Sequence, residues 1–345
     1  MLVTSLAVQH VRTHSKYELQ LSPDVTLITG PNGSGKTSLI EALYVALRGT
    51  SFKGSDQEIL QHDAPWYRID VGFDGEARTV KFDPSRSMGR KQFIINSKVH
   101  YRLPAGEKQP VVLFEPDDLR LISGSPVRRR QFIDRFIAQL DPQYAVSLRR
   151  YERALKQRNT LLKRSGRLSD DLFAWNVSLS EYGAYIIDKR HQFIGMLAER
   201  MNDLYEAIAH TSDVVVVHYS EKRHADTKQK LLSDLHAHSD RDALLGFTST
   251  GPHRHDLLFE FNGSPALSRA SRGETRSMVL ALKFLEIELI ESLAGVKPLI
   301  LLDDVFSELD EKRQRYLASS TRGAQIIITS ATADPGVKAG IHASL

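Results

Sequence analysis

The stretch that decides the fold is Gly30-Pro31-Asn32-Gly33-Ser34-Gly35-Lys36-Thr37, a full match to the pattern G-x-x-x-x-G-K-[ST]. A short apolar run, residues 25–28, precedes it, and an amphipathic run that begins at Ser38 follows it. Strand, glycine-rich loop and helix is the context that marks a phosphate-binding loop. The loop N–H groups and helix N-terminus would hold phosphate oxygens, Lys36 would reach the β- and γ-phosphates, and Thr37 would hold Mg²⁺. The sequence therefore predicts an ATP site at residues 30–38.

Length and composition bound the class of protein. At 345 residues the chain is long enough for two or three lobes, and 41% hydrophobic with 26% charged residues is typical of globular proteins. No apolar run approaches the ~18 residues of a membrane span, and the first residues show no secretion signal. The absence of cysteine excludes disulfides and thiolate zinc sites. We expect a cytoplasmic protein with no membrane partner.

The segments around the loop read as short strands. Residues 2–8 and 17–28 suggest a strand pair that leads into the loop, and residues 67–73, 77–82 and 92–95 suggest an antiparallel meander. Arg12 and His14 lie in the turn of the first pair. Two interpretations of these side chains stay open, a return to the nucleotide or an exposed turn.

Helical periodicity dominates from Ser125-Pro126, a good helix start, to about residue 210. Apolar residues at spacings of three, four and seven predict a packed helical hairpin with its turn at Gly166. We therefore predict an inserted helical arm over residues 126–210. Residues 1–125 and 211–345 would form the two lobes of the head.

The first helices of this arm are strongly basic. Residues 128–167 hold twelve arginines and lysines against three acidic residues, a net charge of +9 in a chain whose total is +4. Such a concentration is the electrostatic footprint of a nucleic-acid backbone site. The alternative is a solvated face whose arginines pair with acids elsewhere, but few of these residues have an acid three or four positions away. The candidate DNA-binding residues are Arg128, Arg129, Arg130, Arg149, Arg150, Arg153 and Lys156.

Two further constellations complete the predicted ATP chemistry. The turn Ser271-Arg272-Gly273-Glu274 opens an apolar helix, and N–H groups at a helix N-terminus form an anion site. An apolar strand, residues 299–302, ends in Asp303-Asp304. Asp303 is placed to hold Mg²⁺ through water with Thr37, and Asp304 to polarise the attacking water. The predicted catalytic residues are Lys36, Asp303 and Asp304, with Glu308 as the next candidate base.

The order of these motifs indicates the fold class. ABC-type ATPase heads have four motifs in a fixed order, and this chain has the same order. They are the phosphate loop, an S-x-G-E turn, a strand that ends in two Asp residues, and a late S-x-L-D motif, which here ends at Asp310. Ser330 lies at the switch position. One nucleotide does not need a second phosphate site over two hundred residues away. Two chains facing head to tail do need a second site, because each chain would close the nucleotide bound by the other. We therefore expect an ATP-dependent homodimer. The predicted fold is an α/β ABC-type P-loop head, a mixed sheet flanked by helices plus an antiparallel β subdomain, with an inserted α-helical arm of the SMC-like branch.

Within that branch the chain resembles the RecF recombination proteins over nearly its whole length. The resemblance implies an ATP-dependent dimer that binds double-stranded DNA, favours single-strand/double-strand junctions, and works with RecR and RecO to load recombinase at gaps. It also implies slow ATP hydrolysis that releases the dimer from DNA. Three positions depart from the family pattern: His255 in place of Asp, Arg272 in place of Gln, and Glu274 in place of Gln. The residues that carry the resemblance are 30–37, 113–119, 124–130, 155–159, 175, 181–183, 250–254, 270–276 and 301–310.

Two other functions stay open at this point. The ATPase subunit of a membrane transporter shares the same four motifs, but it would lack the +9 arm and carry a Gln near residue 115. The second is a nucleotide-sensing clamp with negligible turnover. Asp304 has a shorter side chain than the Glu that is usual for the base, and would position the attacking water badly if this interpretation holds.

Overall fold

The computed structural model describes residues 2–165, 170–305, 309–321, 323–331 and 339–345. The predicted turn at Gly166 and the candidate base Glu308 lie outside the described residues. The chain divides into two compact units, one formed by residues up to Asp118 with Ile287–Leu345, and one by Leu119–Glu286.

The first unit contains a parallel sheet whose strands are buried apolar runs. Its order is β14-β3-β13-β12-β8, and every neighbouring pair is parallel. Strands buried on both faces read as continuous Val, Ile and Leu. Parallel pairing places the carboxyl ends at one edge, with Asp303 opposite Thr329 and Ser330 opposite Thr29. The bounds are β3 Val25–Thr29, β8 Val111–Phe114, β12 Leu299–Asp303, β13 Ile326–Ser330 and β14 Ile341–Ser344.

The second sheet of this unit is antiparallel and confirms the predicted β subdomain. Its order is β2-β1-β4-β5-β6-β7, and buried residues alternate with partly exposed ones along β4. That alternation is expected where one face of a sheet packs on a core. The bounds are β1 Val3–Val11, β2 His14–Gln20, β4 Tyr67–Phe73, β5 Ala77–Phe82, β6 Lys91–Ile95 and β7 Lys98–His100.

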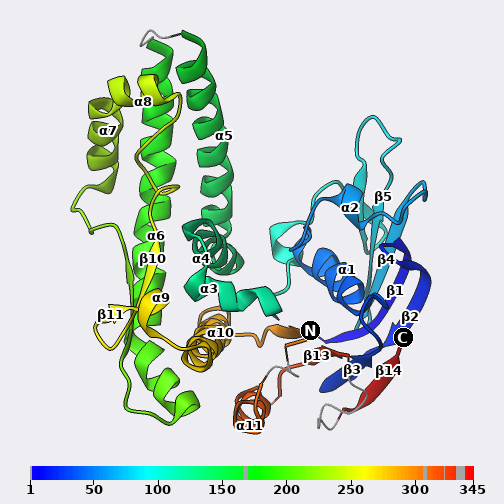
Figure 1. The fold of residues 1–345 in the computed structure, drawn as a ribbon. Helices are drawn as coiled ribbons and strands as arrows, with labels where there is room; N and C mark the ends of the chain where they lie inside the picture. The colour runs from blue at the N-terminus through cyan, green and yellow to red at the C-terminus, as the bar shows by residue number, and fades with distance from the viewer. Residues whose placement is uncertain (1, 166–169, 306–308, 322, 332–338) are drawn as a thin grey trace. The chain divides into compact units, whose positions relative to one another are not determined.

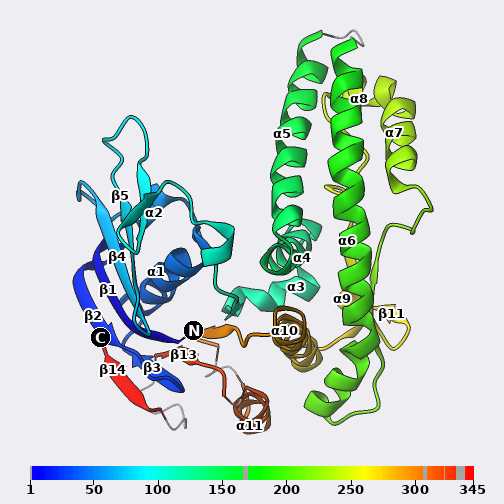
Figure 2. The ribbon, with the colours of Figure 1, turned by 180° about the vertical axis from the view of Figure 1, so that it is seen from behind.

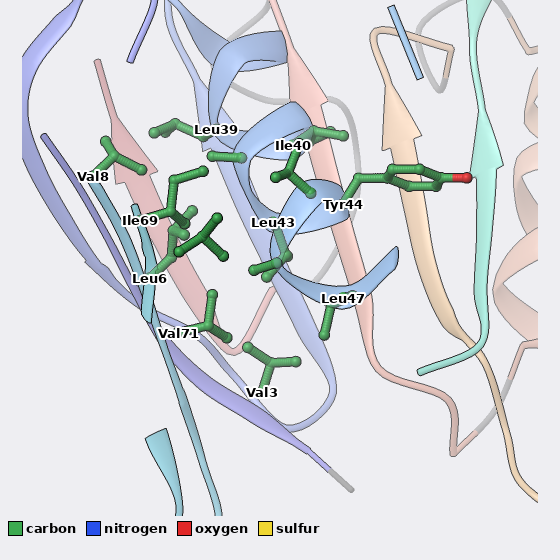
Figure 3. Packing of buried hydrophobic residues seen from close by; sticks show 14 of the residues in the cluster. Val3, Leu6, Val8, Leu39, Ile40, Leu43, Tyr44, Leu47, Ile69 and Val71 are labelled. Carbon is green, nitrogen blue, oxygen red and sulfur yellow. The ribbon is translucent and has the colours of Figure 1, made fainter. Parts of the chain in front are cut away.

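Helix α1 (Lys36–Arg48) is the centre of the first core. Its Leu39, Ile40 and Leu43 pack with side chains of β1 and β4 (Figure 3), and the same cluster includes residues of β8, β12 and β13. The sequence pattern suggested an amphipathic helix with one solvated face. The helix is instead buried on nearly all sides, from Leu39 to Leu47, because both sheets contribute to the cluster around it. The unit also holds α2 (Asp56–Ile59), α11 (Glu311–Ser320) and the 3₁₀ turn Ala105–Glu107.

The second unit is built on a helical hairpin, as the sequence predicts. Helices α5 (Pro142–Ser165) and α6 (Asp170–Ala209) lie side by side in both views (Figures 1 and 2). Their buried seam includes Tyr144, Tyr151 and Leu179. Short α3 (Arg120–Ser123), which follows the 3₁₀ turn Pro116–Leu119, and α4 (Pro126–Leu140) precede the hairpin. No helix within the described residues is long and apolar enough to span a membrane.

The boundary between the units differs from the predicted one. We expected the chain to rejoin the head at residue 211, but it stays with the helical unit to Glu286. Buried polar contacts hold residues 211–286 on the helical hairpin. Arg158 of α5 forms a fully buried ion pair with Asp242 at 2.7 Å, and Arg190 of α6 donates to the Pro252 carbonyl oxygen at 2.7 Å. The segment comprises β9 Val215–Tyr219, α7 Thr227–Ala237, α8 Ser239–Leu245, β10 Leu257–Phe261, β11 Ser264–Pro265, α9 Ala266–Arg269 and the start of α10 Arg272–Ala294.

The Arg158–Asp242 pair predicts a large stability effect. Asp242→Ala would leave a guanidinium buried without its counter-ion, and we expect a loss of about 3–5 kcal/mol in the free energy of unfolding. Asp240→Ala is the matched control, because Asp240 is exposed on the same helix, and its effect should stay within about 0.5 kcal/mol. Denaturant titration followed by circular dichroism measures both. Equal midpoints for the two variants would contradict the structural role of the pair.

Candidate functional site

The loop before α1 has the backbone of a phosphate cradle. Gly33 and Gly35 have φ values of 85° and 98°, in the left-handed region that favours glycine. A Cβ atom on Gly35 would lie 2.3 Å from His14 Nε2 and 2.5 Å from Thr13 Oγ1, so any other residue would have to displace these side chains. The loop is therefore shaped by its own glycines and by the β1–β2 turn packed against it.

Lys36 is held inside this loop. The side chain is only 3% exposed, and its Nζ donates to the carbonyl oxygens of Gly30 at 2.9 Å and Pro31 at 3.2 Å. The carboxylate of Asp304 lies 3.8 Å from Nζ. A buried ammonium surrounded by neutral carbonyls and one carboxylate is suited to receive an anion. Lys36 thus occupies the position that the sequence assigns to it.

Asp303 joins the end of β12 to the loop. Its Oδ1 accepts hydrogen bonds from Thr37 Oγ1 at 2.7 Å and from Thr329 Oγ1 at 3.0 Å. Thr37 and Asp303 are 266 positions apart in sequence, and the parallel sheet brings them together. A hydroxyl beside a buried carboxylate is the oxygen donor set that Mg²⁺ takes in P-loop sites. The two residues fit the predicted metal role.

Asp304 has an unusual backbone and a perturbed acid group. Its φ of 52° is in the left-handed region, and its N–H donates to Thr329 Oγ1 at 3.0 Å. Burial raises the pKa of the Asp304 carboxyl and so does the charge of Asp303, while Lys36 lowers it. The net result is a pKa above the ordinary value, which makes the carboxylate a better proton acceptor than an exposed Asp.

The two residues of the β1–β2 turn return to the P-loop helix. Arg12 makes two 2.9 Å hydrogen bonds to the carboxylate of Glu41, a buried residue of α1. His14 Nε2 donates to the Gly35 carbonyl oxygen at 3.1 Å. The exposed-turn interpretation is thus wrong for His14, which is buried, and the turn forms one wall of the site.

Sequence reasoning missed Lys53. Its ammonium group lies 3.7 Å from Asp303 Oδ2, whereas Thr37 donates to Oδ1 of the same carboxylate. Its loop is fixed because Ser51 Oγ donates to Glu41 at 2.5 Å and accepts the Lys53 N–H at 2.8 Å. The segment 49–54 reads in sequence as a break after the helix. No pattern there distinguishes Lys53 from a solvated lysine.

Another turn carboxylate has a structural role. Asp118 accepts the N–H of Glu115 at 2.8 Å and so caps the turn after β8. Asp118 therefore stabilises the turn that follows β8.

The predicted second anion site is an exposed helix start. The Ser271 N–H donates to Glu274 Oε2 at 2.5 Å, and the Glu274 N–H donates to Ser271 Oγ at 3.3 Å, a reciprocal capping box. Glu274, one of the departures from the family pattern, thus serves as a helix cap. Ser271, Arg272 and Gly273 are exposed. They open α10 in the second unit, whereas the phosphate loop belongs to the first.

Asp310, the last residue of the S-x-L-D motif (the predicted D-loop), and Ser330, the predicted switch residue, both lie at the ends of elements. Asp310 is the exposed N-cap of α11 and accepts the N–H of Arg313 at 2.9 Å. Ser330 is the buried last residue of β13, and its carbonyl oxygen accepts the Gly30 N–H at 3.3 Å. Ser330 therefore lies against the phosphate loop.

The seven basic candidates of the arm divide into two groups. Arg129 forms a two-pronged ion pair with Asp256, at 2.8 and 2.7 Å, and Arg130 donates to the His255 carbonyl oxygen at 2.8 Å. Arg129 is thus paired with a distant acid, the alternative that the sequence left open, and Arg130 is bonded within the same unit, whereas Arg128 on α4 is half-buried. The other four lie exposed on α5: Arg149, Arg150, Arg153 and Lys156.

His255, another departure from the family pattern, belongs to a partly buried network. Burial, with the charge of Arg190 adding to it, lowers the pKa of His255 to about 3, so the ring is neutral near pH 7. Nε2 lies 3.3 Å from Glu221, and the Tyr219 hydroxyl lies 2.9 Å from Nδ1. The ring therefore serves the packing of the turn against β9.

The chain is similar in sequence to proteins of a known family. It is 33% identical to the DNA replication and repair protein RecF of Lachnoclostridium phytofermentans, over 95% of this chain and 92% of that one. The chain belongs to the RecF family. The RecF of Protochlamydia amoebophila is also 33% identical, over 97% and 95% of the two chains. A family model described as an AAA domain matches residues 5–148.

Solved structures agree with the family and the fold. A structure of the recombination mediator protein RecF-ATP in the RecFOR pathway has a TM-score of 0.88 and 28% identity, and the match covers 99% of this chain and 95% of that one. An Smc head bound to the winged-helix domain of ScpA has a TM-score of 0.54 at 14% identity, which shows the fold alone. The predicted ABC-type head with a helical insert and the RecF resemblance are both confirmed.

Alanine substitution at the two glycines of the loop should lower the free energy of unfolding by different amounts. Gly33→Ala and Gly35→Ala both place a side chain at positive φ, which costs about 1–2 kcal/mol. Gly35→Ala additionally drives a Cβ into His14 and Thr13, whereas nothing lies within 4 Å at Gly33. We expect a loss of about 3 kcal/mol or more in the free energy of unfolding for Gly35→Ala, measured by chemical denaturation. A cost no larger than that of Gly33→Ala would contradict the packing of the β1–β2 turn on the loop.

Proposed function

We propose that this chain is a Mg²⁺-dependent ATPase that dimerises around two ATP molecules and binds DNA in recombinational repair. The observation that carries the proposal is the junction of Lys36, Thr37, Asp303 and Asp304 at one edge of the parallel sheet. The similar solved structure of RecF with ATP supports ATP as the nucleotide. Slow hydrolysis would release the dimer.

The residues of the junction have distinct roles in this proposal. The N–H groups of residues 30–38 bind phosphate oxygens, and Lys36 moves from the loop carbonyls to the β- and γ-phosphates. Thr37 and Asp303 would hold Mg²⁺, which would supply positive charge beside the phosphates. Asp304 orients the attacking water and accepts its proton, a role that its raised pKa favours.

Dimerisation is proposed from the exposed start of α10. Ser271, Arg272 and Gly273 are exposed at the N-terminus of a 23-residue helix, where N–H groups and the helix dipole favour an anion. In a head-to-tail pair, this turn of each chain would contact the γ-phosphate bound by its partner. Asp310 and Ser330 would complete the interface as D-loop and switch residues.

DNA binding is proposed on α5. Arg149, Arg153 and Lys156 are exposed and follow one another at spacings of four and three, so they share a helix face. A row of cations spaced in this way contacts phosphates without reading sequence. From membership of the RecF family we further propose binding to double-stranded DNA and to single-strand/double-strand junctions, with RecR and RecO as partners that load recombinase at gaps, in the cytoplasm.

Two variants separate nucleotide binding from hydrolysis. Lys36→Met removes the ammonium that offsets phosphate charge, so ATP binding in calorimetry and ATP-dependent dimerisation should both be lost. Asp304→Asn should bind ATP and stay dimeric, with turnover lower by about 10²–10⁴-fold. In the unmodified protein, turnover should fall on the acid side as Asp304 is protonated, above the pH expected of an ordinary Asp. Unchanged turnover in Asp304→Asn would move the base to another residue, with Glu308 the next candidate.

A second pair of variants separates dimerisation from DNA binding. Ser271→Arg should keep ATP binding by the monomer but block the dimer in sedimentation, because a bulky cation fills the turn. Glu substitution at Arg149, Arg150 and Arg153 should leave the ATP-dependent dimer intact and weaken DNA binding. The slope of log K against log salt should become shallower by roughly 0.9 for each phosphate that the variant no longer neutralises. Wild-type DNA affinity and slope in the triple variant would exclude α5 as the DNA surface.

A further inference from the structure

The second unit contains a cavity of about 190 Å³ beside the basic residues of α5. At the volume water occupies in the liquid, this is room for about six water molecules. Three helices and one turn form its walls. The lining residues are Val127, Arg130, Gln131 and Asp134 of α4, Leu148, Tyr151, Glu152 and Leu155 of α5, Ile186 and Arg190 of α6, and Pro252 and His253.

The more buried lining residues, which we call the floor of the cavity, are Asp134, Tyr151, Arg190 and His253, and they are hydrogen-bonded within the unit. Arg190 Nε and Nη2 donate to the two carboxylate oxygens of Asp134 at 3.0 and 2.9 Å. His253 Nε2 donates to the Thr248 carbonyl oxygen at 3.0 Å, so its Nδ1 accepts the Tyr151 hydroxyl at 2.7 Å. Burial lowers the pKa of His253 to about 4, which keeps this ring neutral. The Asp134–Arg190 pair is therefore compensated within the cavity wall, and Arg130, a further lining cation, donates to the His255 carbonyl oxygen at 2.8 Å.

The remaining lining combines apolar walls with a polar rim. Leu148, Leu155 and Ile186 supply aliphatic surface, and Val127 is exposed at the edge. Gln131 and Glu152 are exposed side chains among the lining residues, and they offer an amide and a carboxylate. Apolar walls with a few polar groups are typical of sites for a ring that carries hydrogen-bonding atoms on its edge.

The cavity adjoins the proposed phosphate-binding face. Glu152 lies three positions after Arg149 and four before Lys156 on α5, and helix neighbours at these spacings have Cβ atoms about 5–6 Å apart. Arg149, Glu152 and Lys156 are all exposed, so they lie together on the solvent side of α5. A chain of phosphates on Arg149, Arg153 and Lys156 would therefore pass the rim of the cavity.

We propose that the cavity takes one unpaired nucleobase of a single-stranded segment whose phosphates lie on Arg149, Arg153 and Lys156. A base has apolar faces for Leu148 and Leu155 and an edge of donors and acceptors for Gln131 and Glu152, the pairing chemistry of amides and carboxylates. Bases in a duplex are stacked and paired, so the site selects unstacked ones. This inference rests on the proposed DNA-binding face and adds a second contact to it.

The first test uses the unmodified protein with ATP and two end-labelled strands in fluorescence anisotropy. One is a short oligothymidine, and the other is the same backbone with every base removed, so that only the sugars and phosphates remain. Base contacts in single-strand sites contribute about 1–3 kcal/mol each, so we expect the oligothymidine to bind about tenfold more tightly. Equal affinities for the two strands would overturn the proposal without any variant.

The second test fills the cavity from its rim. Val127→Trp places a large ring at an exposed lining position, so the preference for bases over the bare backbone should be lost while duplex affinity is unchanged. Gln143→Trp is the matched control, because Gln143 is exposed on α5 and does not line the cavity. It should keep the preference. Val127→Trp with a retained preference would overturn the proposal.

The charge-reversed triple variant distinguishes the two possible failures. If it binds duplex and single strands like the unmodified protein, the DNA-binding face itself is wrong, and the nucleobase site falls with it. If it loses affinity while Val127→Trp and base removal have no effect, the face is right and the cavity takes no base.

Discussion

The hydrogen bond from Thr37 to Asp303 is the contact on which the proposed chemistry depends. It links the first turn of α1 to the end of β12, and it exists because β3, β13 and β12 are parallel and end at the same edge. The carboxylate is buried, so its charge acts over a low-dielectric path and needs cations nearby. Lys53 lies against one oxygen of Asp303, and Lys36 lies against Asp304. Two carboxylates and two ammonium groups thus face one another where a nucleotide with its metal would enter.

Burial of charge organises the second unit as well. Arg158 and Arg190 are almost fully buried, and each is held by a carboxylate together with neutral hydrogen-bond acceptors. Removing one partner of such a pair is costly, so the pairs fix which segments pack on the hairpin. They explain why residues 211–286 stay with the arm. The arginines that remain exposed on α5 are then available to a ligand outside the unit.

Helix α5 therefore carries two kinds of cation, one that stabilises the fold and one that is exposed to a ligand. Arg158 on one side of α5 has no exposed surface and serves the fold, whereas Arg149 and Arg153 on another side are exposed and serve no described contact of comparable strength. A count of charges along the sequence treats them alike. Separating them requires knowing which acids, such as Asp242 and Asp256, reach the helices from elsewhere in the chain.

The sequence by itself determined the local features, because these depend on residues close together in the chain. The glycine pattern before Lys36, the apolar strand ending at Asp303 and the S-x-x-E helix start at Ser271 specified a P-loop head, and the periodicity after Pro126 specified the hairpin. Only the tertiary structure decided what depends on distant contacts. It placed Lys53 beside Asp303, buried α1 on nearly all sides, and paired Arg129 with Asp256. Burial and ion pairing join residues that are far apart in sequence, and no local pattern records them.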